Sequence, residues 1–310
     1  MSRTIQSVAV LGGGLMGAGI AESVSLAGFP VVIRELPEFT AAARSRLEHS
    51  LDGAVKRGKL DADDRAAALA RVTFTSELKD VAGSDLVIEA VPENLGLKIS
   101  IMKELNEIVS HDTVLASNTS SIPIAELASV VANPARVLGL HFFSPVPVMK
   151  LVEIVRALDT ADETVALAQE FVARLGKRSI ETKDRAGFIV NFLLTPYLIG
   201  AVRMYEEGFA TREDIDTGMK LGAGHPMGPL ELCDFIGLDI LQAVCESLFD
   251  EFRRDAYAAP PLMKRMVAAS AWAASPAGVS MNAPVSPPVW VTPGGGRPIR
   301  VAGIRCRRGC

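Results

Sequence analysis

The stretch Ile5-Gln-Ser-Val-Ala-Val-Leu-Gly-Gly-Gly-Leu-Met-Gly17 carries the strongest fold information in the chain. It begins with a short apolar run, residues 5–11, which predicts a buried parallel strand. The run passes into the pattern Gly12-x-Gly14-x-x-Gly17, and helix-forming residues continue to position 27. A strand, a G-x-G-x-x-G turn and a helix in this order are typical of a dinucleotide-binding unit.

The residues of this turn have separate physical roles. Gly12 allows the tight turn, Gly14 lets the backbone approach a pyrophosphate, and Gly17 lets the helix pack closely on the strand. The helix begins at Leu15 and Met16, where unpaired N–H groups and the positive end of the helix dipole favour phosphate. We therefore expect all five residues to contact the cofactor.

An acidic residue stands where the ribose of such a cofactor is normally bound. Glu35 follows Gly17 by 18 residues, at the end of a second apolar run, 30–34. A carboxylate at this place accepts hydrogen bonds from ribose hydroxyls and repels a 2′-phosphate, so it favours NAD over NADP. The neighbouring Arg34 acts against that preference. A glutamate here also suits FAD, so this motif alone leaves the cofactor open.

Strand and helix patterns alternate through the first part of the chain. Strands are predicted at 30–34, 85–89, 113–117 and 136–141, and helices at 15–27, 40–56, 95–110 and 122–132. This alternation indicates a Rossmann-type parallel α/β sheet with right-handed crossovers. Beyond about residue 184 only helices are predicted, at 187–205, 212–220, 230–252 and 262–269. We therefore expect a Rossmann domain over 1–183 and an all-α domain over 184–270.

Composition excludes several classes of protein. The 310 residues are 49% hydrophobic and 22% charged, with a net charge of −4, which argues against a nucleic-acid-binding protein. The four cysteines are too few and too irregularly spaced for a disulfide framework or a zinc site, and Cys233 and Cys245 are expected in the core. Polar residues interrupt the apolar stretch 189–205, so no membrane span is expected. No metal site is predicted, and the N-terminus lacks a signal-peptide pattern, which favours a cytoplasmic setting.

A histidine and a glutamate form a candidate catalytic pair. His141 ends the apolar run 136–141, and strand carboxyl ends are where ligands bind in such sheets. Glu153 lies in a second apolar stretch twelve residues later, and the prolines between them turn the chain back. A carboxylate that fixes the tautomer of an imidazole makes a general base. From spacing alone, a hydrogen-bonded core histidine is the favoured interpretation.

Several ordered segments of residues 7–269 resemble the L-3-hydroxyacyl-CoA dehydrogenase family, most closely its bacterial 3-hydroxybutyryl-CoA dehydrogenases. They are Gly12–Glu22, Val87-Ile-Glu-Ala-Val-Pro-Glu-Asn94, Ala116-Ser-Asn-Thr-Ser-Ser121, Gly139–Glu153, Arg185-Ala-Gly-Phe-Ile-Val-Asn191 and His225-Pro-Met-Gly-Pro229. The resemblance implies reversible oxidation of a 3-hydroxyacyl-CoA to a 3-oxoacyl-CoA by NAD. It also implies a homodimer formed through the helical domain.

The resemblance assigns roles to individual residues. His141 and Glu153 match the family's catalytic pair, and Ser120 and Asn191 match its contacts to the substrate oxygen. Cofactor contacts correspond to Glu93 and Lys98, beside Ser120 and Ser144. The family binds CoA near a segment that here contains Ser50, Lys56, Arg57 and Lys59, where cations suit phosphates. His225 is expected to be structural, and His49 and His111 exposed.

Two positions depart from the family pattern. The family commonly has Asn where this chain has Ser144, whose shorter side chain is expected to loosen a nicotinamide or ring contact while it retains a hydroxyl. It often has Arg or a small residue where this chain has Phe192, which puts local packing in doubt.

The last forty residues have a different character. Residues 271–310 contain six Pro and six Gly, and the last acidic residue of the chain is Asp255. Such a composition predicts disorder. One choice of codons for Trp272–Asn282, translated from the third base, gives Gly-Arg-Glu-Ser-Gly-Arg-Gly-Phe-Tyr-Glu, the ending typical of the family. We therefore interpret 271–310 as a tail produced by a reading-frame shift near residue 270, with a genuine basic extension as the alternative.

Three other functions are weighed against this one. A 3-hydroxyacid dehydrogenase would have Asn-x-x-x-Lys on its interdomain helix, but Thr195 stands four residues after Asn191. A sugar-acid dehydrogenase of the same fold is a further alternative, although Phe142-Phe143 favours acyl-CoA chemistry. The altered C-terminus also allows an inactive binding protein. Acyl chain length, the physiological direction and the pathway stay open.

Overall fold

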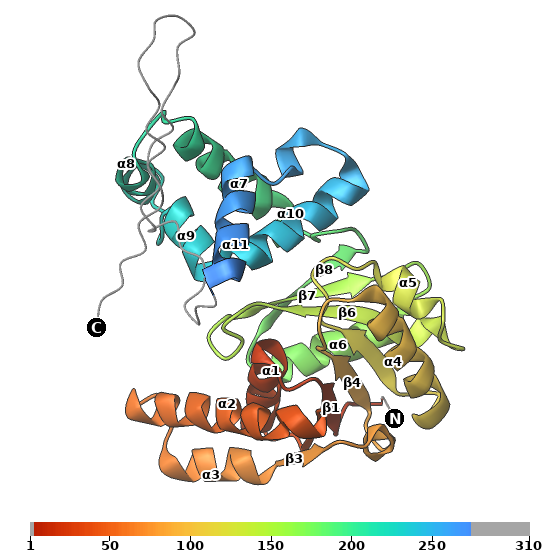
Figure 1. The fold of residues 1–310 in the computed structure, drawn as a ribbon. Coiled ribbons are helices and arrows are strands. Elements are labelled where there is room, and N and C mark those ends of the chain that lie inside the picture. Colours follow the sequence, from red (N-terminus) through yellow and green to blue (C-terminus); the bar gives the residue numbers. More distant parts are fainter. Residues whose placement is uncertain (1–2, 274–310) are drawn as a thin grey trace, which may run out of the picture.

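The computed structural model describes residues 3–273. Its centre is one eight-stranded sheet of order β3-β2-β1-β4-β5-β6-β7-β8 (Figure 1). The strands are β1 Val8–Leu11, β2 Val31–Arg34, β3 Val72–Thr75, β4 Leu86–Glu89, β5 Val114–Ser117, β6 Val137–Phe142, β7 Leu151–Arg156 and β8 Arg178–Lys183. Neighbouring strands are parallel except β6 and β7, which are antiparallel. The sheet is therefore the predicted Rossmann type, extended by two strands beyond β6.

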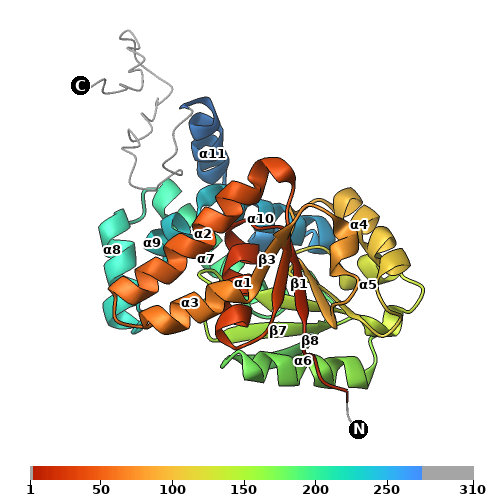
Figure 2. The ribbon, with the colours of Figure 1, turned by 90° about the horizontal axis from the view of Figure 1, so that it is seen from below.

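Helices cover both faces of this sheet (Figure 2). One apolar cluster joins the sheet to α1 Leu15–Leu26, α2 Pro37–Lys56, α3 Ala62–Ala70 and α6 Asp162–Arg174. A second cluster on the other face joins it to α4 Leu95–Ile108 and α5 Ile124–Ala128. Burial on both faces explains why these strands are apolar runs without alternation. Because β1, β4 and β5 are parallel neighbours, their carboxyl ends meet at one edge of the sheet.

The second part of the described chain is helical, as predicted. It consists of α7 Val190–Glu206, α8 Arg212–Thr217, α9 Pro229–Ile236, α10 Leu238–Phe252 and α11 Pro261–Ala273. Its core contains both Cys233 and Cys245, which are buried as expected. Burial raises the pKa of each thiol to about 12. Across residues 3–273, no helix combines the length and apolarity that crossing a membrane requires.

Three predicted helices have different bounds in the structure. The single helix predicted over 230–252 is wrong, because Gly237, at φ +98°, ends α9 and begins α10. The helix predicted over 212–220 ends at Thr217 and continues as a π-helical turn, Gly218–Gly222. The helix predicted over 122–132 is reduced to the five residues of α5, preceded by Pro123.

The segment between the two parts is short. It runs from the end of β8 at Lys183 to the start of α7 at Val190, close to the boundary predicted at 183/184. The helix α11 continues three residues past the predicted domain end at 270. The remainder of the predicted tail lies outside the described residues.

Candidate active site

The glycine turn after β1 has the shape that a pyrophosphate requires. A Cβ on Gly12 would lie 2.6 Å from the carbonyl oxygen of Ala90, and one on Gly17 only 1.8 Å from that of Gly12. Around Gly14, by contrast, a Cβ would meet no atom within 4 Å. Gly14 is also the N-cap of α1, and no side chain caps this helix end. The helix N-terminus therefore presents open space to an anion.

Glu35 lies beside this turn as predicted. Its Oε2 accepts a hydrogen bond from the backbone N of Gly13 at 2.7 Å, and its Oε1 accepts one from Leu36 N at 2.8 Å. The neighbouring Arg34 donates from Nε to the carbonyl oxygen of Ser76 at 3.2 Å. The carboxylate therefore stands next to the phosphate-binding turn, while the Arg34 guanidinium is engaged with the loop after β3. These residues fit NAD.

A buried ion pair lies next along the same edge of the sheet. Glu89, the last residue of β4, accepts from Lys98 Nζ at 2.6 Å and from Ser117 Oγ at 2.6 Å. It also accepts from the backbone N of Val91 at 2.8 Å. Glu89 and Lys98 are at most 1% exposed. Three donors thus compensate the desolvation of this carboxylate.

Glu93 connects that pair to the loop that carries Ser120. Its Oε2 lies 3.2 Å from Lys98 Nζ, and its Oε1 accepts from Thr119 Oγ1 at 2.5 Å and from Ser121 Oγ at 2.8 Å. The backbone N of Ser120 donates to the same oxygen at 3.2 Å. Burial raises the pKa of Glu93, but Lys98 and the hydroxyl donors outweigh it and hold the pKa below its ordinary range. Glu93 is therefore a stable anion that fixes the Ser120 loop.

His141 and Glu153 form the predicted pair. They are directly opposite in the β6–β7 ladder, and Nδ1 of His141 lies 2.7 Å from Oε2 of Glu153. The ring of His141 contacts Phe143 and Phe188, with centroids 4.6 and 5.4 Å away. The histidine is buried to 6% exposure. The antiparallel pairing explains how two residues twelve apart in sequence meet.

The second oxygen of Glu153 reaches the helical part. Its Oε1 accepts from the backbone N of Ile189 and of Val190, both at 3.0 Å, at the start of α7. Phe188 holds a positive φ of 47° just before these residues. A bulky residue in this conformation is strained, and such strain persists where the surroundings enforce it. Asn191 follows in the first turn of α7. The same carboxylate therefore holds both the ring of His141 and the start of the helix that contains Asn191.

A cavity of about 380 Å³ lies between α1, α2 and the β6–β7 loop. Ser50 and Ser144 both line it, which brings together two residues predicted for substrate and cofactor. Of the predicted cations, Lys56 and Lys59 are exposed and are not among the lining residues. Arg57, the third predicted cation, does line the cavity, together with Arg46 and His49. Of the three predicted cations, Arg57 alone is therefore placed at this cavity.

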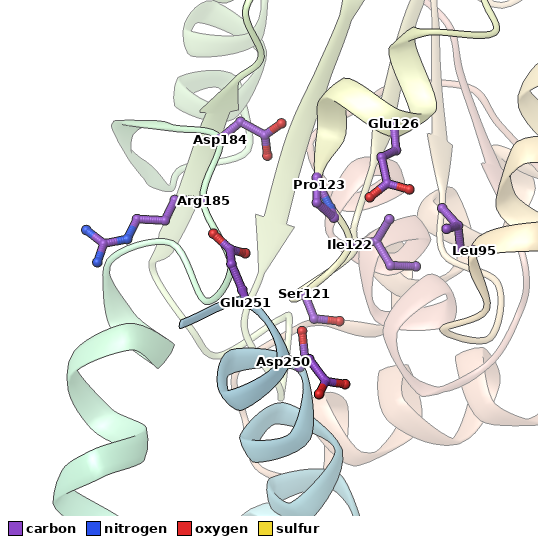
Figure 3. Close-up of a pocket in the computed structure, with 10 residues that line it drawn as sticks. Leu95, Ser121, Ile122, Pro123, Glu126, Asp184, Arg185, Asp250 and Glu251 are labelled. Atoms are coloured by element: carbon purple, nitrogen blue, oxygen red, sulfur yellow. The ribbon is translucent and has the colours of Figure 1, made fainter. Parts of the chain in front are cut away.

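A larger cavity of about 550 Å³ lies where the two parts meet. Figure 3 shows Asp250 and Glu251 of α10 on one side of it and Ser121 and Pro123 on the other. Glu251 accepts from the backbone N of Ala186 at 3.2 Å, so this acid braces the linker. Of the residues assigned to the site, none lines this space, although Ser121 adjoins Ser120.

A glycine turn that fits a pyrophosphate, a carboxylate beside it and a buried histidine–carboxylate pair on one Rossmann sheet are typical of a nicotinamide-dependent dehydrogenase. Family models narrow this class. Residues 7–185 match the NAD binding domain of 3-hydroxyacyl-CoA dehydrogenase, and residues 187–278 match its C-terminal domain. The chain therefore belongs to the 3-hydroxyacyl-CoA dehydrogenase family and is an NAD-dependent oxidoreductase.

Individual relatives agree with the family models. A 3-hydroxybutyryl-CoA dehydrogenase of Mycobacterium tuberculosis is 49% identical over 272 residues, which cover 87% of this chain and 95% of the relative. The crystal structure of FadB2 from M. tuberculosis matches with a TM-score of 0.85 and 48% identity, over 86% of this chain and 95% of that one. The structure of (S)-3-hydroxybutyryl-CoA dehydrogenase PaaH1 from Ralstonia eutropha gives 0.81 and 43%, with the same coverage.

Sequence reasoning missed some residues of this edge. No role was predicted for Glu89, although a carboxylate that ends a buried apolar strand is itself a signal. Asn118 accepts from the backbone N of Phe142 at 2.9 Å and so joins the Ser120 loop to β6.

Phe192 is packed against Phe252 and under the Arg185 guanidinium, which settles the doubt about its packing. His49 and His111 are exposed as expected, and His225 Nδ1 lies 3.1 Å from Tyr197 Oη.

Proposed function

We propose that this protein reversibly oxidises a short-chain (S)-3-hydroxyacyl-CoA, 3-hydroxybutyryl-CoA, to the 3-oxoacyl-CoA. The observation that carries the proposal is the His141–Glu153 pair at 2.7 Å, beside a glycine turn that fits NAD. The relatives named above as 3-hydroxybutyryl-CoA dehydrogenases support the substrate class.

His141 acts as the general acid and base. Its Nδ1 is engaged by Glu153, so the ring is held as the tautomer with the proton on Nδ1. Nε2 is then the basic nitrogen, and it takes the proton of the substrate hydroxyl. Bound NAD supplies the hydride acceptor for C3 of the substrate. Glu153 stabilises the imidazolium that forms, and in the reverse direction the same nitrogen returns the proton to the oxygen.

Ser120 and Asn191 orient the reacting oxygen. Ser120 lies in the loop that Glu93 fixes, and Asn191 lies in the first turn of the helix that Glu153 fixes. A hydroxyl and an amide both donate hydrogen bonds, which suits an oxygen that gains negative charge in the reaction. Substrate is thus bound between the two parts of the chain.

The CoA portion lies in the cavity between α1 and α2. Ser50, Arg46 and Arg57 line it, and cations with a hydroxyl suit phosphate and amide groups. Lys56 and Lys59, on the exposed side of the same segment, contribute only to the field that attracts the phosphates. Ser144 borders both this cavity and the nicotinamide side of the site.

The protein functions as a cytoplasmic homodimer, with domains at 1–183 and 184–270. Support for the dimer comes from large apolar side chains that the helical part exposes, namely Leu193, Phe209, Leu221, Phe235 and Ile240. Apolar surface of this kind typically marks an association site. The buried free thiols Cys233 and Cys245 are consistent with a reducing compartment.

Initial rates with acetoacetyl-CoA test the proposal. NADH and NADPH are compared in parallel, for the unmodified protein and for His141→Ala. We expect NADH oxidation by the unmodified protein and its loss in the variant. A preference for NADPH would contradict the role of Glu35, and absence of turnover by folded protein would favour a hydroxyacid or sugar-acid substrate. Aggregated, inactive protein would instead implicate the altered C-terminus.

A further inference from the structure

One acidic side chain points into the cavity assigned to CoA. Glu22, in the middle of α1, is among the residues that line the cavity, although it is only 2% exposed. Within the described part of the chain, it is the one acid in that lining, where Arg46 and Arg57 supply the positive charge. An ionised carboxylate there would repel the phosphates of an anionic ligand and weaken its binding.

Glu22 interacts with both walls of the cavity. On one side its carboxyl is hydrogen-bonded to Ser50 and feels the charge of Arg57, both from α2. On the other side it feels Lys177, whose Nζ donates to the carbonyl oxygens of Val146 at 2.6 Å and Met149 at 2.8 Å. These carbonyls belong to the β6–β7 loop. The carboxyl is therefore placed between the residue that binds CoA and the loop that closes the cavity.

We propose that Glu22 is a specificity-determining residue of the acyl-CoA site: its charge sets how tightly the cavity holds the phosphates of CoA. The inference rests on the proposed function, because it takes the cavity to be the CoA site. Protonated, Glu22 leaves Arg46 and Arg57 free to attract phosphate and still bonds Ser50. Ionised, it neutralises part of that field and competes with phosphate for Arg57.

The protonation state of Glu22 depends on its surroundings. Burial raises its pKa, and the opposing effects of Ser50, Arg57 and Lys177 do not cancel that rise. Of the other charged groups near α1, Arg71 donates to the Ser25 carbonyl oxygen, and Arg65 is paired with Asp52 at 2.6 Å. Lys150 acts on Lys177, whose pKa burial lowers. His49 also lines the cavity, so its imidazole is replaced in one of the experiments.

The experiment compares two thioesters across pH. Acetoacetyl-CoA carries the phosphates, whereas acetoacetyl-pantetheine lacks them. Glu22→Gln keeps the shape and the hydrogen bond but not the charge. At alkaline pH we expect this variant to lower KM for acetoacetyl-CoA about fivefold. The difference disappears in mild acid, kcat is unchanged, and KM for the pantetheine thioester does not move. Glu48→Gln, on the same helix as Ser50 but outside the lining, is the matched control.

Two further measurements keep the outcomes distinct. The affinity for CoA itself, measured by calorimetry on a His49→Gln variant that retains Glu22, must weaken as pH rises. A CoA affinity that stays constant across pH overturns the inference, and this test requires no substitution at Glu22. Arg57→Gln must raise KM for acetoacetyl-CoA alone. If Arg57→Gln has this effect while Glu22→Gln follows the unmodified protein at every pH, the role of Glu22 is wrong and the CoA site stands. If Arg57→Gln has no effect, the CoA placement itself is wrong.

Discussion

Glu89 and Glu153 are both fully buried at the edge of the sheet, but the side chains that they bind differ. Each accepts three hydrogen bonds, so neither carboxylate is left without compensation. The charged partner of Glu89 is Lys98, which is itself buried. The partner of Glu153 is His141, which we propose as the general acid and base. In the proposed mechanism, the cofactor half of the site is a fixed charge arrangement, whereas the chemical half contains the proton that moves.

The largest effect is expected where that proton resides. His141→Gln removes the basic nitrogen while keeping a polar side chain of similar length. We expect kcat to fall about 10³-fold, since general acid–base catalysis contributes about 10²–10⁴. Steady-state rates with saturating NADH check this value, and NADH affinity should be unchanged. A variant that retains one tenth of the activity would place the general base elsewhere.

A smaller loss is expected at Glu153. Glu153→Gln keeps an oxygen for the N–H groups at the start of α7 but removes the charge that stabilises the imidazolium. We expect kcat for reduction to fall about 10²-fold. The basic limb of the pH–rate profile should move to lower pH, because the imidazolium that donates the proton loses its stabilising charge. Glu181→Gln is the control, since Glu181, on the adjacent β8, pairs with the partly buried Arg156. An unchanged pH profile in Glu153→Gln would separate this carboxylate from the chemistry.

Glu89 should affect stability more than rate. Glu89→Gln leaves the buried Lys98 with Glu93, at 3.2 Å, as its remaining charged partner, and breaking a buried pair typically costs about 3–5 kcal/mol. We expect a lower urea midpoint and a higher KM for NADH, while kcat at saturation changes no more than about threefold. Chemical denaturation and kinetics on the same sample measure both. If kcat falls as far as in Glu153→Gln, the proposed division between the two glutamates is wrong.

The smallest effect concerns pH and Glu93. Its pKa is lowered in the folded protein, so its ionised form stabilises the fold above the unfolded pKa. That contribution is lost as pH falls through the folded value. Glu93→Gln should therefore lower Tm at neutral pH by a few degrees, and the difference should shrink in acid. Tm measured across pH checks this, and a constant difference would show that the charge is unimportant.

Local patterns predicted the nucleotide-binding edge well. The run 5–11 and the glycines after it placed β1 and α1, and Glu35 was found from its distance along the chain. The pair His141 and Glu153 was found because prolines turn the chain between two apolar stretches. Each of these signals lies within a short window of sequence, where one crossover or hairpin fixes the geometry.

Other features depend on contacts that no short window contains. The strand β8 alternates charged and partly buried residues and looks like a surface segment until β7 pairs with it. The bonds from Glu153 to residues 189 and 190 join positions 36 and 37 apart across two parts of the chain. The sequence predicted Lys56, Arg57 and Lys59 alike, and only the tertiary structure at the end of α2 places Arg57, and not the two lysines, at the cavity.

The bonds from Glu153 to the start of α7 also limit how far the chain is modular. Two family models meet at residues 185 and 187, as though the halves were interchangeable parts. Yet one carboxylate oxygen of Glu153 bonds His141 in the first half, and the other accepts from the backbone at the start of the second half. A separated Rossmann half would keep the glycine turn and Glu35 and would bind nucleotide, but its Glu153 would lose two of three donors. Recombination between relatives at this junction must therefore preserve the backbone of 187–190, whatever side chains it exchanges.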